Sequence, residues 1–340
     1  MGSEMCIRDR SEGGPGLPTS SNPKQGSPAD WFMAIHPSTW LHDRAGVMAE
    51  KPGRVGIVGL GLIGGSLGLD LQACGWTVQG LVHRQVTAER AIARGLVDAV
   101  STNPRCLADC DVVILALPIP LLLNPPDELV AALPESAVVT DVGSVKQPIL
   151  EAWRHRHPRF VASHPMAGTA NAGVDAGVSD LFRGRPWIAT PDSGTDPMAL
   201  DQVRDLAVSV GGHWLTSTAT QHDQAVALIS HMPVLVSAAL LRAVGDERDP
   251  EIRQLAMVLA SSGFADTSRV GGGNPHLGVA MASSNRDAVL RGLAAYRWSL
   301  EQLEDAVLQE NWSQLELELS RTQTLRPGFL KAPGEVSSES

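Results

Sequence analysis

The stretch RVGIVGLGLIG, residues 54–64, joins a run of apolar and β-branched residues to a turn that holds three glycines. Gly59 permits a tight turn, Gly61 allows the backbone to approach a pyrophosphate, and Gly64 allows a helix to pack closely on the strand. Such a motif is weak evidence by itself, and a glycine-rich turn without a ligand is the alternative. Here it directly joins a predicted strand to a predicted helix, which is the context that dinucleotide binding requires.

The helix after this turn is expected over residues 62–74. Its first turn has backbone N–H groups without partners in the helix, at the positive end of the helix dipole. Both features favour a phosphate group. We therefore predict a cofactor site formed by Gly59, Gly61, Leu62, Ile63 and Gly64.

The end of the second predicted strand, 77–82, indicates which nicotinamide cofactor binds. An NAD enzyme usually carries Asp or Glu there, which accepts a hydrogen bond from the ribose 2′-hydroxyl. This chain has His83 and Arg84 instead, and no acid. The planar guanidinium of Arg84 suits a 2′-phosphate, with His83 as a second donor, so we predict NADP rather than NAD. The alternative is that Arg84 is a solvated surface charge.

Strand and helix patterns alternate through the rest of this half of the chain. Further strands are expected at 112–117, 137–142, 160–163, 187–190 and 213–216. Apolar residues spaced at i, i+3, i+4 and i+7 predict an amphipathic helix around 203–210. This alternation is typical of an α/β Rossmann-type fold with a doubly wound, mostly parallel sheet.

Strand signals stop after about residue 219. The segments 222–244, 249–262 and 284–319 are rich in Ala and Leu and predict helices. We therefore expect an NADP-binding domain over 48–218, followed by an all-helical substrate and dimerisation domain over 219–330.

Both ends of the chain have a different composition. Residues 1–47 are rich in Gly, Pro and Ser and predict a disordered leader, and 331–340 predict a loose tail. The string MCIRDR at 5–10 resembles translated sequencing-adapter sequence, so we hypothesise that translation starts near Met48 and that the leader is not native. It has no apolar core of a secretory signal, and the four cysteines form no CxxC pair. These features predict a cytoplasmic protein without a metal site.

Charge and hydropathy exclude several classes of partner. The 340 residues carry a formal net charge of −10, which argues against general affinity for nucleic acid or for anionic membranes. The longest apolar run, 112–123, is shorter than the ~20 residues that span a bilayer. We expect a small-molecule partner and neither nucleic acid nor membrane.

Polar residues follow three of the predicted strands. Pro118 follows one strand, Ser144 lies in the DVGSVK segment after the next, and His164 lies in SHPMAGT after the third. The carboxyl ends of parallel strands meet at one edge of a sheet, which brings Ser144 and His164 close to a bound nicotinamide. A hydroxyl beside a histidine can fix its tautomer, and a neutral imidazole can accept a proton. A purely structural histidine before a proline is the alternative.

The helical half contributes a second set of residues. His222 and Asp223 begin a helix, and Pro233 is expected to kink that helix near His231. A proline that is merely tolerated there is the alternative. The segment 263–274 is predicted to be a loop that presents Arg269, whose guanidinium can bind both oxygens of a carboxylate. A local ion pair with Asp266 is the competing interpretation.

The motifs GLGLIGGSLG, DVGSVK, SHPMAGT, HDQAVALISHMP and GFADTSRVGGGNP occur in this order over roughly residues 54–330. Together they resemble the prephenate/arogenate dehydrogenase family, and most closely the short NADP-dependent arogenate dehydrogenases of the cyanobacterial type. The resemblance implies an oxidative decarboxylation in tyrosine biosynthesis. A hydride leaves the ring carbon that bears the hydroxyl, CO₂ leaves the opposite carbon, and the ring becomes aromatic.

The resemblance also implies roles for individual residues. His164 would be the base that takes the ring-hydroxyl proton, and Ser144 would hold His164 and contact both the nicotinamide and the hydroxyl. Arg269 would bind a substrate carboxylate, with His231 and Thr169 near the substrate. Pro118 would lie in the cofactor site. A homodimer through the helical domain is expected.

Alternatives remain open at this point. Prephenate, which would give 4-hydroxyphenylpyruvate, is the competing substrate, and Val234 stands where some members have a second histidine. A β-hydroxyacid dehydrogenase would usually rely on a lysine from the helical domain, and this chain has none there before Lys331. A non-catalytic NADPH sensor would not need Ser144, His164 and Arg269 together.

Overall fold

The computed structural model describes residues 53–169 and 171–330, which belong to one compact unit. The predicted leader at 1–47 and the predicted tail at 331–340 lie outside the described residues.

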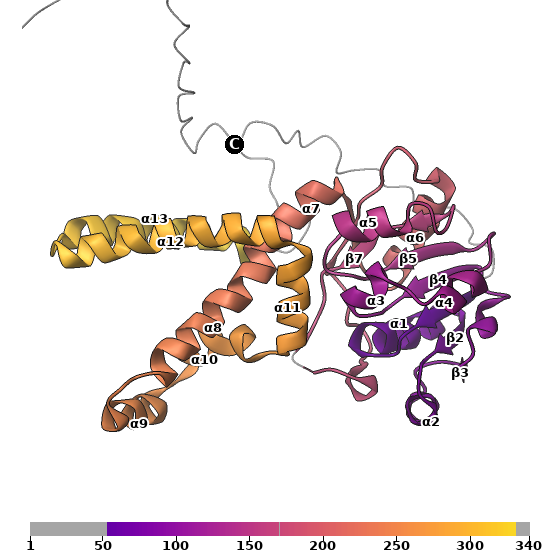
Figure 1. Ribbon diagram of the computed structural model, residues 1–340, viewed down its shortest axis with the longest axis horizontal. Coiled ribbons are helices and arrows are strands. Elements are labelled where there is room, and N and C mark those ends of the chain that lie inside the picture. The colour runs from indigo at the N-terminus through magenta and orange to yellow at the C-terminus, as the bar shows by residue number, and fades with distance from the viewer. Residues whose placement is uncertain (1–52, 170, 331–340) are drawn as a thin grey trace, which may run out of the picture. The chain divides into compact units, whose positions relative to one another are not determined.

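A six-stranded parallel sheet forms the first half of the fold (Figure 1). Its strand order is β3-β2-β1-β4-β5-β6. β2 and β3 therefore lie on one side of β1, and β4 to β6 lie on its other side. The strands are β1 (Arg54–Val58), β2 (Thr77–Leu81), β3 (Ala99–Ser101), β4 (Val112–Leu115), β5 (Val138–Asp141) and β6 (Phe160–Val161). The predicted doubly wound parallel sheet is confirmed. Only the three-residue β3 was not expected.

Both faces of this sheet are buried, which explains its continuous apolar strands. In β4, Val112 and Ile114 join one apolar core, while Val113 and Leu115 join the other. The first core is covered by α1 (Leu62–Ala73), α2 (Gln85–Ala93) and α6 (Pro197–Ser209). The second is covered by α3 (Ile119–Leu123), α4 (Asp127–Ala132) and α5 (Gln147–Trp153).

A second sheet of three strands was not expected as a separate unit. It consists of β7 (Ser163–Pro165), β8 (Pro186–Ala189) and β9 (His213–Thr216), with β7 antiparallel to β8 and β9 parallel to it. The single strand predicted at 160–163 is therefore wrong. The chain leaves the large sheet after Val161, and His164 pairs with Ile188 of β8.

The second half is helical, as predicted. Its α-helices are α7 (Ala219–Val226), α8 (Met232–Gly245), α9 (Pro250–Leu259), α10 (Ser262–Ser268), α11 (Pro275–Ser284), α12 (Arg286–Leu308) and α13 (Trp312–Leu330). A π-helical turn, Ala227–His231, joins α7 to α8, so the predicted interruption before Pro233 takes this form. The single helix expected at 284–319 is wrong, because Glu310 adopts a positive φ and ends it; α12 and α13 then lie side by side (Figure 1).

The loop expected at 263–274 is also wrong. This segment forms α10 and a 3₁₀ turn, Arg269–Gly272, packed against α8. A Cβ on Gly271 would collide with the backbone at Ala238, so glycine allows the close approach. The hydroxyl of Ser237 accepts a hydrogen bond of 2.9 Å from the Gly271 amide and donates one of 2.9 Å to the Thr267 carbonyl. These contacts hold Arg269 on ordered backbone.

One stretch, Ala219–Gly245, is long and apolar enough to cross a membrane by length and composition, with a mean hydropathy of 1.8. This stretch was not expected from the sequence, where 112–123 is the longest apolar run. It includes α7, whose His222 and Asp223 are buried against the sheet region, and the buried His231. Asp223 accepts hydrogen bonds from the backbone amides of Lys146 and Gln147. Packing on the sheet region accounts for the buried residues of α7 only, because 22% of the apolar window is buried and Ser237 is the one buried residue of α8.

Candidate active site

The glycine turn has the geometry that a dinucleotide requires. Gly59 has a φ of +94°, and its amide donates to the Leu81 carbonyl at 2.9 Å, which ties the turn to β2. A Cβ on Gly64 would collide with the Gly59 carbonyl, whereas a Cβ on Gly61 would meet nothing within 4 Å. Open space therefore lies over Gly61. No side chain caps α1, so its first N–H groups remain available for a phosphate.

The two residues that are expected to bind the 2′-phosphate of the cofactor's ribose follow the end of β2. His83 and Arg84 are both exposed, and Arg84 is the residue that precedes the first turn of α2. Arg84 forms no ion pair within residues 53–169 and 171–330. The neighbouring Arg90 and Arg94, in contrast, bond to the segment around Asp175. Arg84 is therefore the arginine of this region that is free to meet an anion.

A buried ion pair joins the loops that follow the central strands. Asp141 ends β5 and pairs with Lys146, and both side chains are fully buried. The carboxylate of Asp141 also accepts from the amides of Gly143 at 2.8 Å and Ser163 at 3.1 Å. Burial raises the pKa of Asp141 and lowers that of Lys146, while each charge favours the other. Neither residue carries a predicted role from the sequence.

His164 lies buried on β7 and does not receive its hydrogen bond from Ser144. Its Nδ1 lies 2.9 Å from Nε2 of His222, and Nδ1 of His222 lies 2.7 Å from Oδ1 of Asp223. Burial lowers the pKa of His164 well below its ordinary value, and the nearby His222, Lys146 and His231 act in the same direction. Nε2 of His164 has no hydrogen-bond partner in the part of the chain that the structure describes. A neutral imidazole with one available nitrogen can serve as a base.

Two further polar groups lack partners beside this histidine chain. The hydroxyl of Ser144 and Nε2 of His231 are buried and make no hydrogen bond to any described residue. The Ser144 backbone lies beside His231, whose Nδ1 lies 3.3 Å from Nδ2 of Asn285. Burial lowers the pKa of His231 to about 4. Buried polar atoms without partners are costly, so both groups are candidates to bind a ligand.

The remaining predicted residues lie at exposed positions. Arg269 is exposed in its 3₁₀ turn and makes no ion pair with Asp266 in the described structure. Thr169 is exposed after β7, where its hydroxyl accepts from the Asn171 amide at 3.2 Å. Pro118 is exposed at the start of α3, in the turn that follows β4. None of the three forms a hydrogen bond to the His164 side chain.

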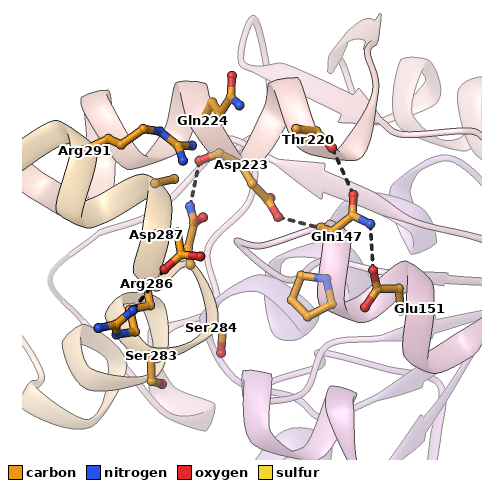
Figure 2. Close-up of a pocket in the computed structure, with 13 residues that line it drawn as sticks. Gln147, Glu151, Thr220, Asp223, Gln224, Ser283, Ser284, Arg286, Asp287 and Arg291 are labelled. Atoms are coloured by element: carbon orange, nitrogen blue, oxygen red, sulfur yellow. Dashed lines mark hydrogen bonds and ion pairs between the residues drawn. The ribbon is translucent and has the colours of Figure 1, made fainter. Parts of the chain in front are cut away.

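A cavity of about 650 Å³ borders the histidine chain but contains none of the predicted site residues. It lies between α5, α7 and the start of α12, and Figure 2 shows Gln147 and Asp223 joined across its wall. Asn285 donates to the Asp223 carbonyl at 2.6 Å from the other side. The cavity therefore marks the junction between the sheet region and the helical region.

Comparison with known proteins gives matches over both halves of the chain. Residues 67–216 match the family described as prephenate dehydrogenase, nucleotide-binding domain, and residues 218–321 match prephenate dehydrogenase, dimerization domain. A cyclohexadienyl dehydrogenase of Zymomonas mobilis is 30% identical, over 76% of this chain and 89% of its own length.

Two solved structures are also similar. The arogenate dehydrogenase of Synechocystis is 42% identical with a TM-score of 0.70, over 82% of this chain and 100% of that one. The prephenate dehydrogenase of A. aeolicus, in complex with hydroxyphenyl propionate and NAD⁺, is 27% identical with a TM-score of 0.77, over 83% of this chain and 100% of that one.

Proposed function

The chain belongs to the prephenate dehydrogenase family, and from that membership we propose that it converts arogenate to tyrosine by oxidative decarboxylation with NADP⁺. The observation that carries the proposal is the buried, neutral His164, whose Nε2 has no partner among the described residues. A base in this state can take a hydroxyl proton at neutral pH.

The choice of substrate rests on similarity. The Synechocystis arogenate dehydrogenase is 42% identical to this chain, whereas the A. aeolicus and Bacillus subtilis prephenate dehydrogenases are 27% and 28% identical. Prephenate, which would give 4-hydroxyphenylpyruvate, is the second candidate because the curated relatives include enzymes named for it.

The choice of NADP rests on the end of β2. A 2′-phosphate carries nearly two negative charges, and the exposed guanidinium of Arg84 can bind its oxygens, with His83 beside it. No Asp or Glu stands in the HRQ segment at 83–85 to accept from a 2′-hydroxyl. The pyrophosphate would lie over Gly61, at the N-terminus of α1.

The reaction needs few protein groups. Bound NADP⁺ would accept the hydride from the ring carbon that bears the hydroxyl. Nε2 of His164 draws the hydroxyl proton as the hydride leaves, CO₂ departs from the opposite carbon, and the proton returns to the phenol oxygen. Aromatisation supplies most of the driving force, so the chain must mainly orient its substrate and hold one proton.

Polar side-chain groups that lack a hydrogen-bond or ion-pair partner among the described residues would position the substrate. The Ser144 hydroxyl and Nε2 of His231 are buried polar atoms that can bond to the substrate. Arg269 can bind a carboxylate through two N–H groups, and Thr169 would lie near the substrate. No contact with a metal is required for any of these steps.

We also propose a cytoplasmic homodimer formed through the helical domain. Helix α9 has no buried residue, and its apolar side chains are exposed: Ile252, Leu255, Met257, Val258 and Leu259. Such a surface on a domain of the dimerisation type would be covered by a second copy.

A steady-state assay tests the proposal. Arogenate and prephenate are each offered with NADP⁺ and with NAD⁺, and kcat/KM is compared across the four pairs. The highest value is expected for arogenate with NADP⁺. Activity with prephenate alone would overturn the choice of substrate, and a tenfold preference for NAD⁺ would overturn the choice of cofactor.

A further inference from the structure

Three buried side chains form a continuous hydrogen-bonded chain that ends at the proposed base. Asp223, His222 and His164 are linked by distances of 2.7 Å and 2.9 Å, and all three are buried. The two imidazole rings meet nearly edge to face, at 73°. Asp223 and His222 come from α7, whereas His164 comes from β7, so the chain crosses between the helical region and the sheets.

The hydrogen bonds of Asp223 define which way the protons point. Its Oδ1 accepts from the Lys146 amide at 2.7 Å, and its Oδ2 accepts from the Gln147 amide at 2.9 Å. A carboxylate held by two backbone donors acts as an acceptor only. Nδ1 of His222 must therefore carry a proton and donate it to Oδ1 of Asp223.

The same reasoning extends to the next ring. Burial lowers the pKa of His222, so this imidazole is neutral near pH 7, and its Nε2 carries a lone pair. That nitrogen can only accept, so Nδ1 of His164 donates to it. The lone pair of His164 is then left on Nε2, the nitrogen without a partner among the described residues.

We propose that His222 is a positioning residue that fixes the tautomer and the orientation of His164, and that Asp223 fixes His222 in turn. The inference rests on the proposed function for its consequence, because it specifies which nitrogen of His164 takes the hydroxyl proton. The arrangement follows the general logic of a base oriented by a third group.

Charge in the surroundings supports this arrangement. When Nε2 of His164 takes a proton, the ring becomes an imidazolium whose Nδ1–H still donates to Nε2 of His222, with the Asp223 carboxylate behind it. The other titratable groups that face His164 are Lys146, whose charge is offset by its pair with Asp141, and the neutral His231. Asp223 is thus the carboxylate that balances the transient imidazolium.

The hydrogen-bonded series Asp223–His222–His164 is also anchored by both the sheet region and the helical region. Asp223 holds the start of α5 through the amides of Lys146 and Gln147. Asn285, at the start of α12, donates to the Asp223 carbonyl and approaches Nδ1 of His231. Two regions of the chain therefore fix the position of His222, which a residue that only fills space would not require.

Two substitutions at His222 test whether His164 needs a hydrogen-bond acceptor at this position. Gln in place of His222 sets an amide where Nε2 was, and its carbonyl oxygen can accept from Nδ1 of His164. Leu in place of His222 fills similar space and offers no acceptor. We expect H222L to lower kcat about 100-fold while KM for NADP⁺ changes little, and H222Q to recover a substantial part of kcat.

A buried histidine outside the site provides a matched control. His157 is buried, and its Nε2 lies 3.0 Å from the Pro134 carbonyl, at the far end of α5. His157→Leu removes a buried histidine and its two hydrogen bonds, to the Pro134 carbonyl and from the Arg159 amide, without touching His164, so it should keep the wild-type kcat. Equal losses of kcat in H157L and H222L, or in H222Q and H222L, would overturn the proposal.

A measurement without substrate tests the tautomer directly. In full-length protein labelled with ¹⁵N-histidine, His164 should show a protonated Nδ1 and an unprotonated Nε2, with assignment by loss of its signals in H164N. In H222L the preference of His164 for protonation at Nδ1 should weaken, and in H222Q this preference should persist. A wild-type His164 protonated at Nε2 would overturn the proposal. Because no turnover is measured, this result is independent of whether arogenate is the substrate.

Discussion

Nζ of Lys146 donates to the carbonyl oxygen of Ser163 at 2.6 Å, in a region where both residues are fully buried. The same ammonium group pairs with Asp141 at the end of β5. Ser163 immediately precedes His164, so one buried cation connects the loop after β5 to the strand that carries the proposed base. The ion pair is therefore part of the support of the site.

Loss of this cation should destabilise the fold. Lys146→Met leaves the Asp141 carboxylate buried without its partner, which costs about 3–5 kcal/mol. Urea denaturation measures the free energy of unfolding. The double variant K146M/D141N removes both charges and should be less destabilised than K146M. If the double variant lost as much stability as the single variant, the uncompensated charge would not be the cause.

Replacement of the proposed base should affect turnover rather than cofactor binding. His164→Asn removes the nitrogen that accepts the hydroxyl proton, and general-base removal costs about 10²- to 10⁴-fold in kcat. NADPH fluorescence titration should give an unchanged Kd, because His164 is not part of the glycine turn. In the wild-type enzyme, kcat should persist below pH 6.5, since burial lowers the pKa of His164 well below that ordinary value. Wild-type kcat in H164N would remove His164 from the base role.

Stability should fall in acid because buried neutral histidines resist protonation. The pKa of His231 is lowered from 6.5 to about 4 in the folded chain. The unfolded chain binds the proton first, so this contribution is present above pH 6.5 and is lost as the pH falls toward about 4, by up to about 3 kcal/mol. His231→Gln should flatten the dependence in denaturation curves. A dependence as steep in H231Q as in wild type would assign it to other groups.

The parallel sheet could be predicted because its strands are short, apolar runs separated by glycines and helical periods. β3 was missed because three residues carry no detectable period. The division at Val161 was missed because the turn toward β8 depends on pairing between Ser163 and Ala189, which lie 26 positions apart. Local pattern has no access to such pairing.

The candidate site was predictable in its members but not in its contacts. His164 and Ser144 follow strands, and His231 precedes a proline, so each carries a local signal. The hydrogen bond between His164 and His222 joins residues 58 positions apart, and only packing of α7 on the sheet region creates it. His222 and Asp223 at the start of a helix were the available signal, and this signal did not indicate that His164 is the partner of His222.

Cofactor choice can be tested at Arg84. Arg84→Ala removes the charge-assisted hydrogen bonds to a 2′-phosphate, and loss of about 1.5–3 kcal/mol should raise KM for NADP⁺ about 10- to 100-fold. KM for NAD⁺ should not change, because that cofactor lacks the phosphate. Arg204→Ala on α6 is a matched control, since Arg204 pairs only with its neighbours Asp201 and Asp205. An equal rise for both cofactors in R84A would contradict the assignment.

Substrate capture can be tested at Arg269. Arg269→Ala should raise KM for the substrate about 10- to 100-fold, because two N–H contacts to a carboxylate are lost, while kcat falls less. Arg269→Lys should recover only part of the affinity, since an ammonium group cannot bind both oxygens through a planar fork. Arg291→Ala, in the cavity beside α7, is the matched control and should leave KM unchanged. If R269A lowered kcat as strongly as H164N at unchanged KM, Arg269 would act in the chemical step rather than in capture.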